Sequence, residues 1–380
     1  MKELIRIFEK TERLAIGLMS GTSLDGVDIA LVWLRGSGRG VSYELKDFHT
    51  YPIPYALRKR IQAAFTGQAE EICRLNFDLG SFFADLVLDF CSVKKVEIDE
   101  IDLIGSHGQT IRHIHSHSTL QIGEADMIAR KTDTVVVSDF RAADIAAGGS
   151  GAPLVPYFDH VLFRDIPGNL ALQNLGGIGN VTFLPSNRKE PVIAFDTGPA
   201  NAVLNELSEI VSNGQHGYDK DGVLSKRGKC DPDILRELLT HPYFTAELPK
   251  TTGREEFGKE YVKRQMRNTP QLSPPDLLRT CLSLVAQSVV NAYRRYLPTL
   301  DRVIVSGGGA HHPLIVGEIR EGLAGVEVDL IDSVCSIGSD SKEAVAFALL
   351  AHEKINQVPT NIPSVTGADR PVSLGKISVP

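Results

Sequence analysis

The sequence has few cysteines, a single tryptophan and no long apolar run. Its five cysteines are scattered and never spaced as C-x-x-C, which argues against a disulfide scaffold and against a structural zinc site. No apolar stretch approaches the ~18 residues of a membrane-spanning helix. The first residues, MKEL, lack the pattern of a secretory signal. We therefore expect a protein of a reducing, cytoplasmic compartment.

Positive charge is not in excess either. Lysine and arginine number 40 against 47 aspartates and glutamates, giving a formal net charge of −7. This balance argues against non-specific nucleic-acid binding, and the hydrophobic share of 42% argues against disorder. A chain of 380 residues is long enough for two or three domains. The Pro-rich tail from Gln357 is expected to be irregular.

Glycine, by contrast, is abundant, with 34 residues that cluster where apolar strands end. An apolar strand, a glycine-rich turn and a returning strand occur at 16–32 and again at 170–184. This offset of about one domain suggests a duplication, with a boundary at the polar Pro-Gly connector 164–169. Strand patterns alternate with helical periodicity, as at 69–92 and 276–297, so the expected class is α/β.

The first glycine turn, SGTSLDGVD at 20–28, is dense in hydroxyls and backbone N–H groups. Converging N–H groups bind anions, and Asp25 could hold a divalent cation through water. The alternative, a plain hairpin turn with a capping aspartate, is favoured when the segment is taken alone. No G-x-x-x-x-G-K-[ST] occurs, which disfavours a P-loop NTPase.

Another polar turn follows the apolar strand 192–195. It places Asp196 at the C-terminal end of the strand, where α/β sheets present catalytic groups. Thr197 and Gly198 beside it could bind a phosphate through their backbone N–H groups. The alternative is that Asp196 caps the helix after Pro199. The catalytic interpretation is preferred, because two non-helical residues separate the strand from the helix.

A further glycine turn follows the strand 303–306. Its three glycines, Gly307, Gly308 and Gly309, would let a flat ligand lie against bare backbone. The dinucleotide fingerprint G-x-G-x-x-G is absent, so a Rossmann dehydrogenase is disfavoured.

Two more segments are candidates for a binding site, one with a histidine and one with an aspartate and an arginine. GSHGQT at 105–110 follows a strand, and the H-x-H-x-H sequence just beyond is more often unliganded than a zinc site. The strand 134–138 leads into Asp139 and Arg141, which would suit a polar substrate wall or, alternatively, form a surface ion pair.

Taken in order, eight motifs resemble the anhydro-N-acetylmuramic acid kinase family over essentially the whole chain. They are SGTSLDGVD at 20–28, GSHGQT at 105–110, SDFRAADIAAGGSGAPLVP at 138–156, NLGGIGN at 174–180, FDTGPAN at 195–201, TTGREEFG at 251–258, SGGGAHH at 306–312 and SKEAVAFALLA at 341–351. The resemblance implies an α/β fold of two related actin-like ATPase (ribonuclease H-like) domains with an active-site cleft between them. We expect these domains at 1–166 and 167–380, with helix 342–354 as a candidate to pack back onto the first.

The resemblance also implies roles for individual residues. Asp196 matches the aspartate proposed as general base, and Glu343 matches the carboxylate that reaches the sugar. The ATP- and phosphate-binding set would be Gly21, Thr22, Ser23, Leu24, Asp25, Gly26, Val27, Asp28, Gly176, Gly177, Gly307, Gly308 and Gly309. The sugar-side set would be His107, Gln109, Thr110 and Arg141. The family's third glycine turn usually continues with asparagine, and this chain has His312 there, which leaves that nucleotide contact open.

The implied activity converts 1,6-anhydro-N-acetylmuramic acid, ATP and water into N-acetylmuramic acid 6-phosphate and ADP. This reaction belongs to peptidoglycan recycling and amino-sugar catabolism, with ATP and Mg²⁺ as cofactors, and a homodimer is implied as well. Two rival functions stay open at this point. One is a kinase of the same fold that acts on a simple hexose or glycerol, and the other is a non-catalytic ATP-binding module that senses or assembles.

Overall fold

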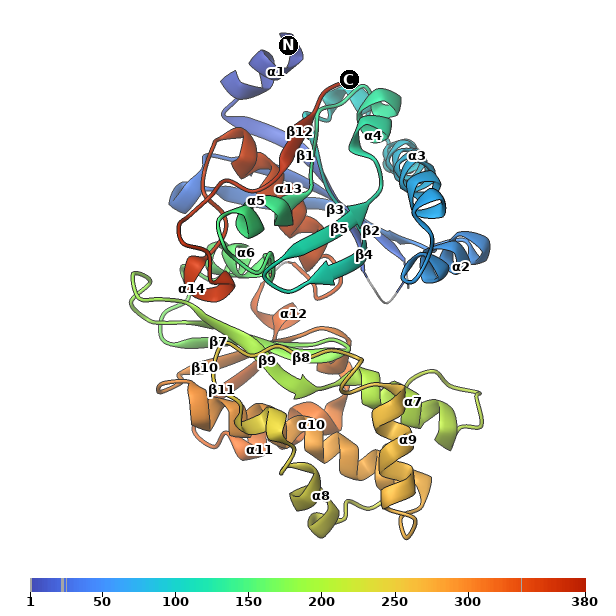
Figure 1. The fold of residues 1–380 in the computed structure, drawn as a ribbon. Coiled ribbons are helices and arrows are strands. Elements are labelled where there is room, and N and C mark those ends of the chain that lie inside the picture. Colours follow the sequence, from blue (N-terminus) through green and yellow to red (C-terminus); the bar gives the residue numbers. More distant parts are fainter. Residues whose placement is uncertain (1, 22–23, 25, 336) are drawn as a thin grey trace. The chain divides into compact units, whose positions relative to one another are not determined.

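The computed structural model describes residues 2–21, 24, 26–335 and 337–380. The chain forms two compact units, unit 1 (Met1–Phe163 and Asp340–Pro380) and unit 2 (Arg164–Ser339), drawn as a ribbon in Figure 1. Unit 1 thus consists of two stretches of chain that are separated in sequence by all of unit 2. This division differs from the expected ranges 1–166 and 167–380 chiefly because residues 340–380 belong to unit 1.

Unit 1 is built on a seven-stranded sheet of order β12-β6-β4-β1-β2-β3, in which β5 pairs with β4. Its strands are β1 (Glu12–Ser20), β2 (Val27–Arg35), β3 (Ser42–Tyr51), β4 (Leu103–Ile114), β5 (Ser118–Ile122), β6 (Val136–Ser138) and β12 (Lys376–Ser378). Its helices are α1 (Lys2–Glu9), α2 (Tyr55–Ala64), α3 (Ala69–Lys94), α4 (Ala125–Thr132), α5 (Phe140–Ala146), α6 (Val155–Leu162), α13 (Lys342–Ile355) and α14 (Pro363–Thr366), with short 3₁₀ turns η1 (Gly38–Gly40) and η2 (Ile98–Glu100). The helix expected over 69–92 is confirmed as α3, whose Leu75, Leu79 and Phe83 recur every four residues and are buried.

The two faces of β1 are covered by different helices, because its side chains alternate in direction. Ile16 is buried in a core that it shares with α3. Gly17 faces the other way, where a Cβ would lie 1.8 Å from the carbonyl oxygen of Ala344 in α13. A Cβ on Gly105, the register partner of Gly17 on β4, would lie 2.1 Å from the carbonyl oxygen of Phe347. The backbone of α13 therefore rests directly on the sheet, which only glycine permits at these two positions.

Two expectations about unit 1 are corrected by the structure. GSHGQT (105–110) is not a turn after a strand but lies inside β4, which continues to Ile114 and pairs with β1 and β5. The tail from Gln357 is not wholly irregular, because it forms α14 and then β12, which pairs antiparallel with β6. Without β12 the outer backbone groups of β6 would form an open sheet edge, and the tail satisfies their hydrogen bonds.

Unit 2 is built on a five-stranded sheet of order β11-β10-β7-β8-β9. Its strands are β7 (Leu170–Leu175), β8 (Ile178–Leu184), β9 (Ile193–Pro199), β10 (Arg302–Ser306) and β11 (Glu327–Leu330). Its helices are α7 (Asn201–Val211), α8 (Pro232–Leu238), α9 (Lys259–Asn268), α10 (Pro274–Tyr296), α11 (Pro313–Gly322) and α12 (Ile331–Val334), with 3₁₀ turns η3 (Lys220–Gly222), η4 (Ser225–Arg227), η5 (Pro242–Thr245) and η6 (Gly308–His311). The long helix expected over 276–297 is confirmed as α10, which is buried along most of its length between α7 and α11.

The two sheets repeat one topology. In unit 1 the path β3-β2-β1-β4-β6 has two antiparallel pairings followed by two parallel ones. In unit 2 the path β9-β8-β7-β10-β11 has the same order and the same directions. This agreement confirms the α/β class and supports the duplication, since the two glycine-turn hairpins β1-β2 and β7-β8 occupy equivalent places.

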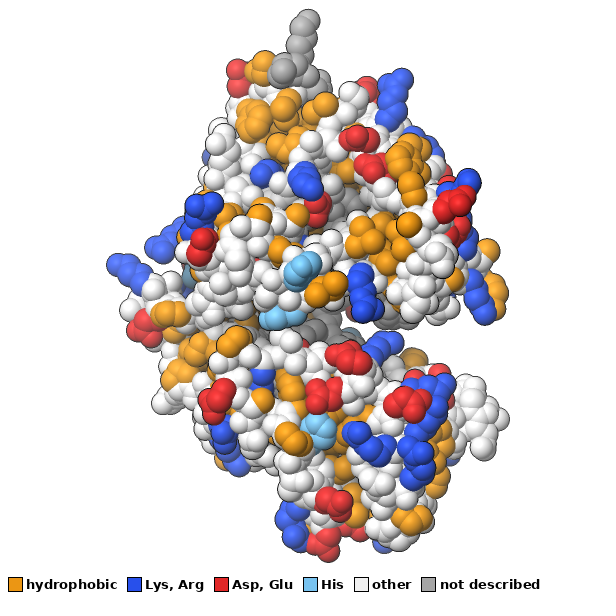
Figure 2. Space-filling model, viewed as in Figure 1, with side chains coloured by type: hydrophobic (Ala, Val, Ile, Leu, Met, Phe, Trp, Pro, Cys, Tyr) orange, Lys and Arg blue, Asp and Glu red, His pale blue; other side chains and the backbone are white. Residues whose placement is uncertain are grey.

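The surface gives two further observations. Among the helices that the structure describes, none combines the length and the hydropathy needed to cross a membrane. On the face drawn in Figure 2, acidic and basic side chains are interspersed over the surface.

Candidate active site

Asp196 is the central residue of β9 and is half-buried. It therefore does not stand after the end of the strand as expected, because β9 continues through Thr197 and Gly198 to Pro199. Its Oδ2 accepts a hydrogen bond from the backbone N–H of Thr252 at 2.9 Å. Burial raises the pKa of Asp196 to about 6, although the Thr252 N–H and the charge of Lys250 favour the ionised form. A carboxylate in this state can take up a proton near neutral pH. The alternative in which Asp196 caps a helix is wrong, because α7 begins at Asn201 with Ala200 as its N-cap.

A buried hydrogen-bond chain lies beside Asp196 and joins β7, β9 and α10. Gln173 on β7 is fully buried, and its Nε2 lies 3.2 Å from the hydroxyl of Thr197. Its Oε1 accepts a hydrogen bond from the hydroxyl of Tyr293 at 2.9 Å. These bonds hold β9 in place at the residue next to Asp196.

The two glycine turns of unit 2 lie against each other. They meet because β7 and β10 are parallel neighbours, so both strands end at the same edge of the sheet. A Cβ on Gly307 would lie 2.4 Å from Oδ1 of Asn174, which shows how closely the turn after β10 approaches the end of β7. The carbonyl oxygens of Gly176 and Gly177 accept hydrogen bonds from the N-terminal N–H groups of α7. The structure thus brings Gly176, Gly177 and 307–309 together.

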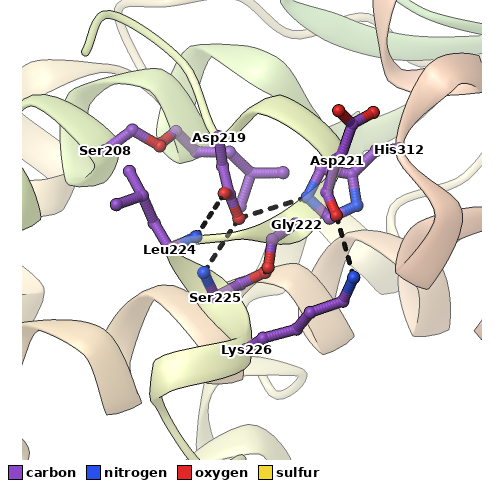
Figure 3. A network of polar contacts seen from close by, with 9 residues as sticks. Ser208, Asp219, Asp221, Gly222, Leu224, Ser225, Lys226 and His312 are labelled. Carbon is purple, nitrogen blue, oxygen red and sulfur yellow. Dashed lines mark hydrogen bonds and ion pairs between the residues drawn. The ribbon is translucent and has the colours of Figure 1, made fainter.

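His312, which follows the third glycine turn, is turned into the protein (Figure 3). It is the N-cap of α11, is 8% exposed, and its Nε2 lies 3.3 Å from Oδ2 of Asp219. The same carboxylate accepts the backbone N–H groups of Leu224 at 2.7 Å and Ser225 at 2.9 Å. His312 therefore ties the segment 219–225 to the start of the helix that follows the third glycine turn.

We expect Asp219→Asn to destabilise unit 2 by about 1–3 kcal/mol, because an amide NH₂ would face a buried N–H donor. Burial alone would raise the pKa of Asp219, but its hydrogen bonds with His312, Ser225 and Leu224 outweigh this and bring the pKa to about 2. Because the folded pKa lies below the unfolded one, this stabilisation is present above about pH 4 and is lost as the pH falls towards 2.

Urea unfolding at pH 7 and pH 3 measures both effects. Asp221→Asn, at an exposed neighbour, is the matched control and should leave the midpoint unchanged. Equal midpoints for the two variants would contradict the assignment.

In unit 1, the buried side chain of His107 orients Arg141. Its Nδ1 lies 2.9 Å from the carbonyl oxygen of Gly108, and its Nε2 lies 3.0 Å from Nη2 of Arg141. A guanidinium only donates, so Nε2 accepts this bond and Nδ1 carries the proton. Burial and then the charge of Arg141 lower the pKa of His107 to about 3, which keeps the ring neutral.

Arg141 and Glu343 lie close enough to influence each other's charge. Burial lowers the pKa of Arg141 to about 10, and Glu343 opposes this change. The side chain of Glu343, at the start of α13, is in part accessible to solvent. Desolvation of its carboxyl group by the surrounding protein raises its pKa, and the charges of Lys342 and Arg141 oppose this change. The ring of His107 lies 4.7 Å from that of Phe347, also on α13. The structure therefore brings His107, Arg141 and Glu343 together.

The alternative of an ion pair between Asp139 and Arg141 is wrong. Asp139 pairs with Lys376 of β12, at 2.5 Å between Oδ2 and Nζ. Arg141 instead donates from Nη1 to the carbonyl oxygen of Gly151 at 2.8 Å, in the glycine-rich segment after α5.

Gln109 and Thr110 are engaged within unit 1. Gln109 is fully buried, where its Oε1 accepts the hydroxyl of Ser20 at 2.7 Å and its Nε2 donates to the carbonyl oxygen of Gly21 at 3.4 Å. The hydroxyl of Thr110 accepts a hydrogen bond from Gln121 at 2.9 Å. Gln109 therefore supports the start of the first glycine turn.

That first turn is described in part: Thr22, Ser23 and Asp25 lie outside the described residues. Leu24 has a φ of 60° and a buried side chain, so only its backbone is available to a ligand at the turn. A Cβ on Gly26 would lie 2.6 Å from Cγ2 of Thr50, which leaves no room for a side chain. Asp28, at the start of β2, accepts the hydroxyl of Thr50 at 2.6 Å.

Metal-binding clusters concern only the part of the chain that the structure describes. Within it, no three His, Cys, Asp or Glu side chains gather closely enough to share an ion. Asp25, the residue suggested for a water-bound Mg²⁺, is not among them.

Three residues beside the candidate site were not singled out from the sequence. Lys250 and Tyr243 lie beside Asp196, and Asp219 pairs with His312. Lys250 directly precedes the TTGREEFG motif, which was the available signal, whereas Tyr243 and Asp219 stand in segments without a motif.

Comparison with known proteins identifies this α/β chain as a kinase. The family model that matches residues 13–380 is described as anhydro-N-acetylmuramic acid kinase, and the chain belongs to that family.

Curated relatives agree with the family assignment. An anhydro-N-acetylmuramic acid kinase of Caldanaerobacter subterraneus subsp. tengcongensis is 46% identical over 397 aligned residues and covers 100% of both chains. One of Bacillus cereus (strain Q1) is 42% identical, covering 96% of this chain and 98% of its own. Among solved structures, an activator of 2-hydroxyisocaproyl-CoA dehydratase from Clostridium difficile aligns with a TM-score of 0.44 and 11% identity, over 90% of this chain and 96% of its own.

Proposed function

We propose that the protein hydrolytically opens 1,6-anhydro-N-acetylmuramic acid and phosphorylates it with ATP, giving N-acetylmuramic acid 6-phosphate and ADP in cell-wall recycling. The observation that carries the hydrolytic step is the Asp196 carboxylate, half-buried on β9 with a pKa raised to about 6. The chain also belongs to a family named for phosphorylating this sugar.

Asp196 is the general base in this proposal. It takes a proton from a water that attacks the anomeric carbon, and the bond from that carbon to the bridging oxygen breaks. The bridging oxygen, O6 of the sugar, then attacks the γ-phosphorus of ATP and ADP leaves. One water is thus consumed for each phosphoryl group transferred.

The sugar would be held by residues of unit 1. Arg141, aimed by the neutral ring of His107, is suited to a carboxylate, because a guanidinium offers paired donors to an anionic group. Glu343 beside it is suited to bind sugar hydroxyls, because a carboxylate accepts hydrogen bonds from them. This assignment places the charged and neutral parts of the substrate on adjacent groups.

The phosphates would be held by the glycine turns, and charge neutralisation would come from Mg²⁺. In kinases Mg²⁺ is bound by one or two carboxylates together with phosphate oxygens and water. The carboxylate of Asp28, next to the first turn, is a candidate ligand because Mg²⁺ prefers oxygen ligands. Asp25 is the second candidate ligand. Phosphoryl transfer depends mainly on such positioning and neutralisation.

Two finer proposals accompany the activity. We propose a homodimer, which sedimentation at micromolar concentration tests. We also propose action in the cytoplasm, where ATP is available and the five free cysteines stay reduced, which cell fractionation tests.

The test of the proposed function is product analysis in ¹⁸O-labelled water. With anhydro-N-acetylmuramic acid, ATP and Mg²⁺, the label should appear at the anomeric hydroxyl and not in the phosphate. Ordinary N-acetylmuramic acid is the control substrate, because its phosphorylation consumes no water. Turnover of a simple hexose in place of the anhydro-sugar, or ATP consumption unaffected by any sugar, would overturn the proposal in favour of one of its rivals.

A further inference from the structure

Lys250 is a buried cation held in an aromatic box. Lys250 lies in the segment between η5 and α9 and is only 6% exposed. The ammonium lies 4.6 Å from the ring centre of Tyr296, 4.7 Å from that of Tyr243 and 5.7 Å from that of Phe195. It also lies 3.3 Å from the backbone carbonyl oxygen of Tyr243. These contacts hold the charge in one place, because ring faces and a carbonyl oxygen all attract a cation.

Two of the residues at this box also bond to the backbone of Asp196 in the middle of β9. The backbone N–H of Asp196 donates to the carbonyl oxygen of Lys250 at 3.3 Å. The hydroxyl of Tyr243 donates to the carbonyl oxygen of Asp196 at 2.7 Å. Lys250 and the aromatic box are therefore tied to the backbone of Asp196 by one backbone–backbone hydrogen bond and one bond from the Tyr243 hydroxyl.

A charged group at this place is costly for folding. Desolvation of an ammonium disfavours the folded state, and an apolar side chain of similar length would fill the box at no such cost. The carboxylate of Asp196 favours the charged form of Lys250 and so offsets part of this cost. The neighbouring Arg295 on α10 has the opposite effect, because it repels the ammonium. The buried ammonium therefore lowers the stability of the folded protein, and its effect is to favour the ionised form of Asp196.

We propose that Lys250 is a positioning residue that keeps Asp196 in its ionised form. This inference rests on the proposed function, in which Asp196 is the general base.

The electrostatics of the site have the required signs. Burial raises the pKa of Asp196, the Thr252 N–H and Lys250 lower it, and Glu255 raises it. Burial and the charge of Arg295 lower the pKa of Lys250 to about 8, with Asp196 opposing, so the ammonium is charged wherever Asp196 titrates. The carboxylate of Glu256, on the same segment, accepts a hydrogen bond from the hydroxyl of Thr252 at 2.6 Å.

Two variants with opposite effects test the inference. In the wild type, kcat/KM should fall as the pH drops through about 6, because the base must be ionised. Lys250→Met should move this acid limb up by about one pH unit, so that kcat/KM falls about fivefold more at pH 6 than at pH 8. Glu255→Gln should move the limb down. The melting temperature of Lys250→Met should be equal to or above that of the wild type.

The possible outcomes separate this inference from the proposed function. A loss of kcat/KM in Lys250→Met that is the same at every pH would show a merely structural role and overturn the inference. Full turnover by Asp196→Asn would instead overturn the proposed function.

The wild-type protein gives a test that does not depend on the variant folding. With ¹³C-labelled lysine and aspartate, the Lys250 side-chain signal should show an inflection at the pH where Asp196 titrates. No inflection there would overturn the inference as well.

Discussion

Replacing Asp196 with asparagine is expected to lower kcat by about 10²–10⁴-fold while nucleotide affinity stays nearly unchanged. Asparagine has the shape of aspartate and keeps an oxygen that can accept the N–H of Thr252, so the backbone around β9 should not move. What is lost is the ability to take a proton from water. Because the carboxylate is held in a setting that raises its pKa to about 6, its removal should leave the melting temperature equal or higher.

The measurements are steady-state turnover of the anhydro-sugar and calorimetric titration with a non-hydrolysable ATP analogue. Glu190→Gln removes an exposed carboxylate from the connection between β8 and β9 in the same unit, and it should behave as the wild type. A variant at Asp196 that turns over as fast as this control would remove Asp196 from the mechanism. A variant that also loses nucleotide binding would indicate a structural role.

The second large effect concerns stability. Gly17→Ala should destabilise unit 1 by at least about 3 kcal/mol, because the new methyl group would lie 1.8 Å from the carbonyl oxygen of Ala344. The clash is with backbone, so it cannot be relieved by a side-chain rotation, and α13 would have to lift off the sheet. Since Glu343 lies at the start of α13, the folded fraction should also bind sugar more weakly.

The single tryptophan makes this measurable. Trp33 lies on β2, so its fluorescence during urea unfolding reports on unit 1. Gly40→Ala is the matched control, because a Cβ there would meet nothing within 4 Å. If both variants unfold at the same urea concentration, the close approach of α13 to β1 is not as described.

Features that depend on local backbone chemistry could be predicted from the sequence. The two glycine-turn hairpins were readable because a tight turn requires residues of a special kind between two apolar strands. The helix α3 was readable because its apolar residues recur with a helical period. Asp196 could be singled out because it stands between an apolar run and a helix, although the structure places it inside β9 and not after it.

Features that depend on which distant side chains meet could not be predicted. His312 and Asp219 are 93 residues apart, and neither segment carries a sign of the other. Lys250 is one lysine among many, and its burial follows from three aromatic rings that come from separate elements. The strand β12 was missed because a three-residue strand has no period of its own and exists only by pairing with β6.

The interruption of unit 1 by unit 2 affects the order in which the protein can fold during synthesis. Unit 2 is one continuous stretch, so its strands leave the ribosome together, whereas one face of the β1–β4 layer has no cover until α13 has been made. Nascent chains of this protein should therefore carry a finished C-terminal-proximal unit and an unfinished N-terminal one, the reverse of the usual N-to-C order. In that interval the apolar sheet of unit 1 is the part that chaperones would have to protect.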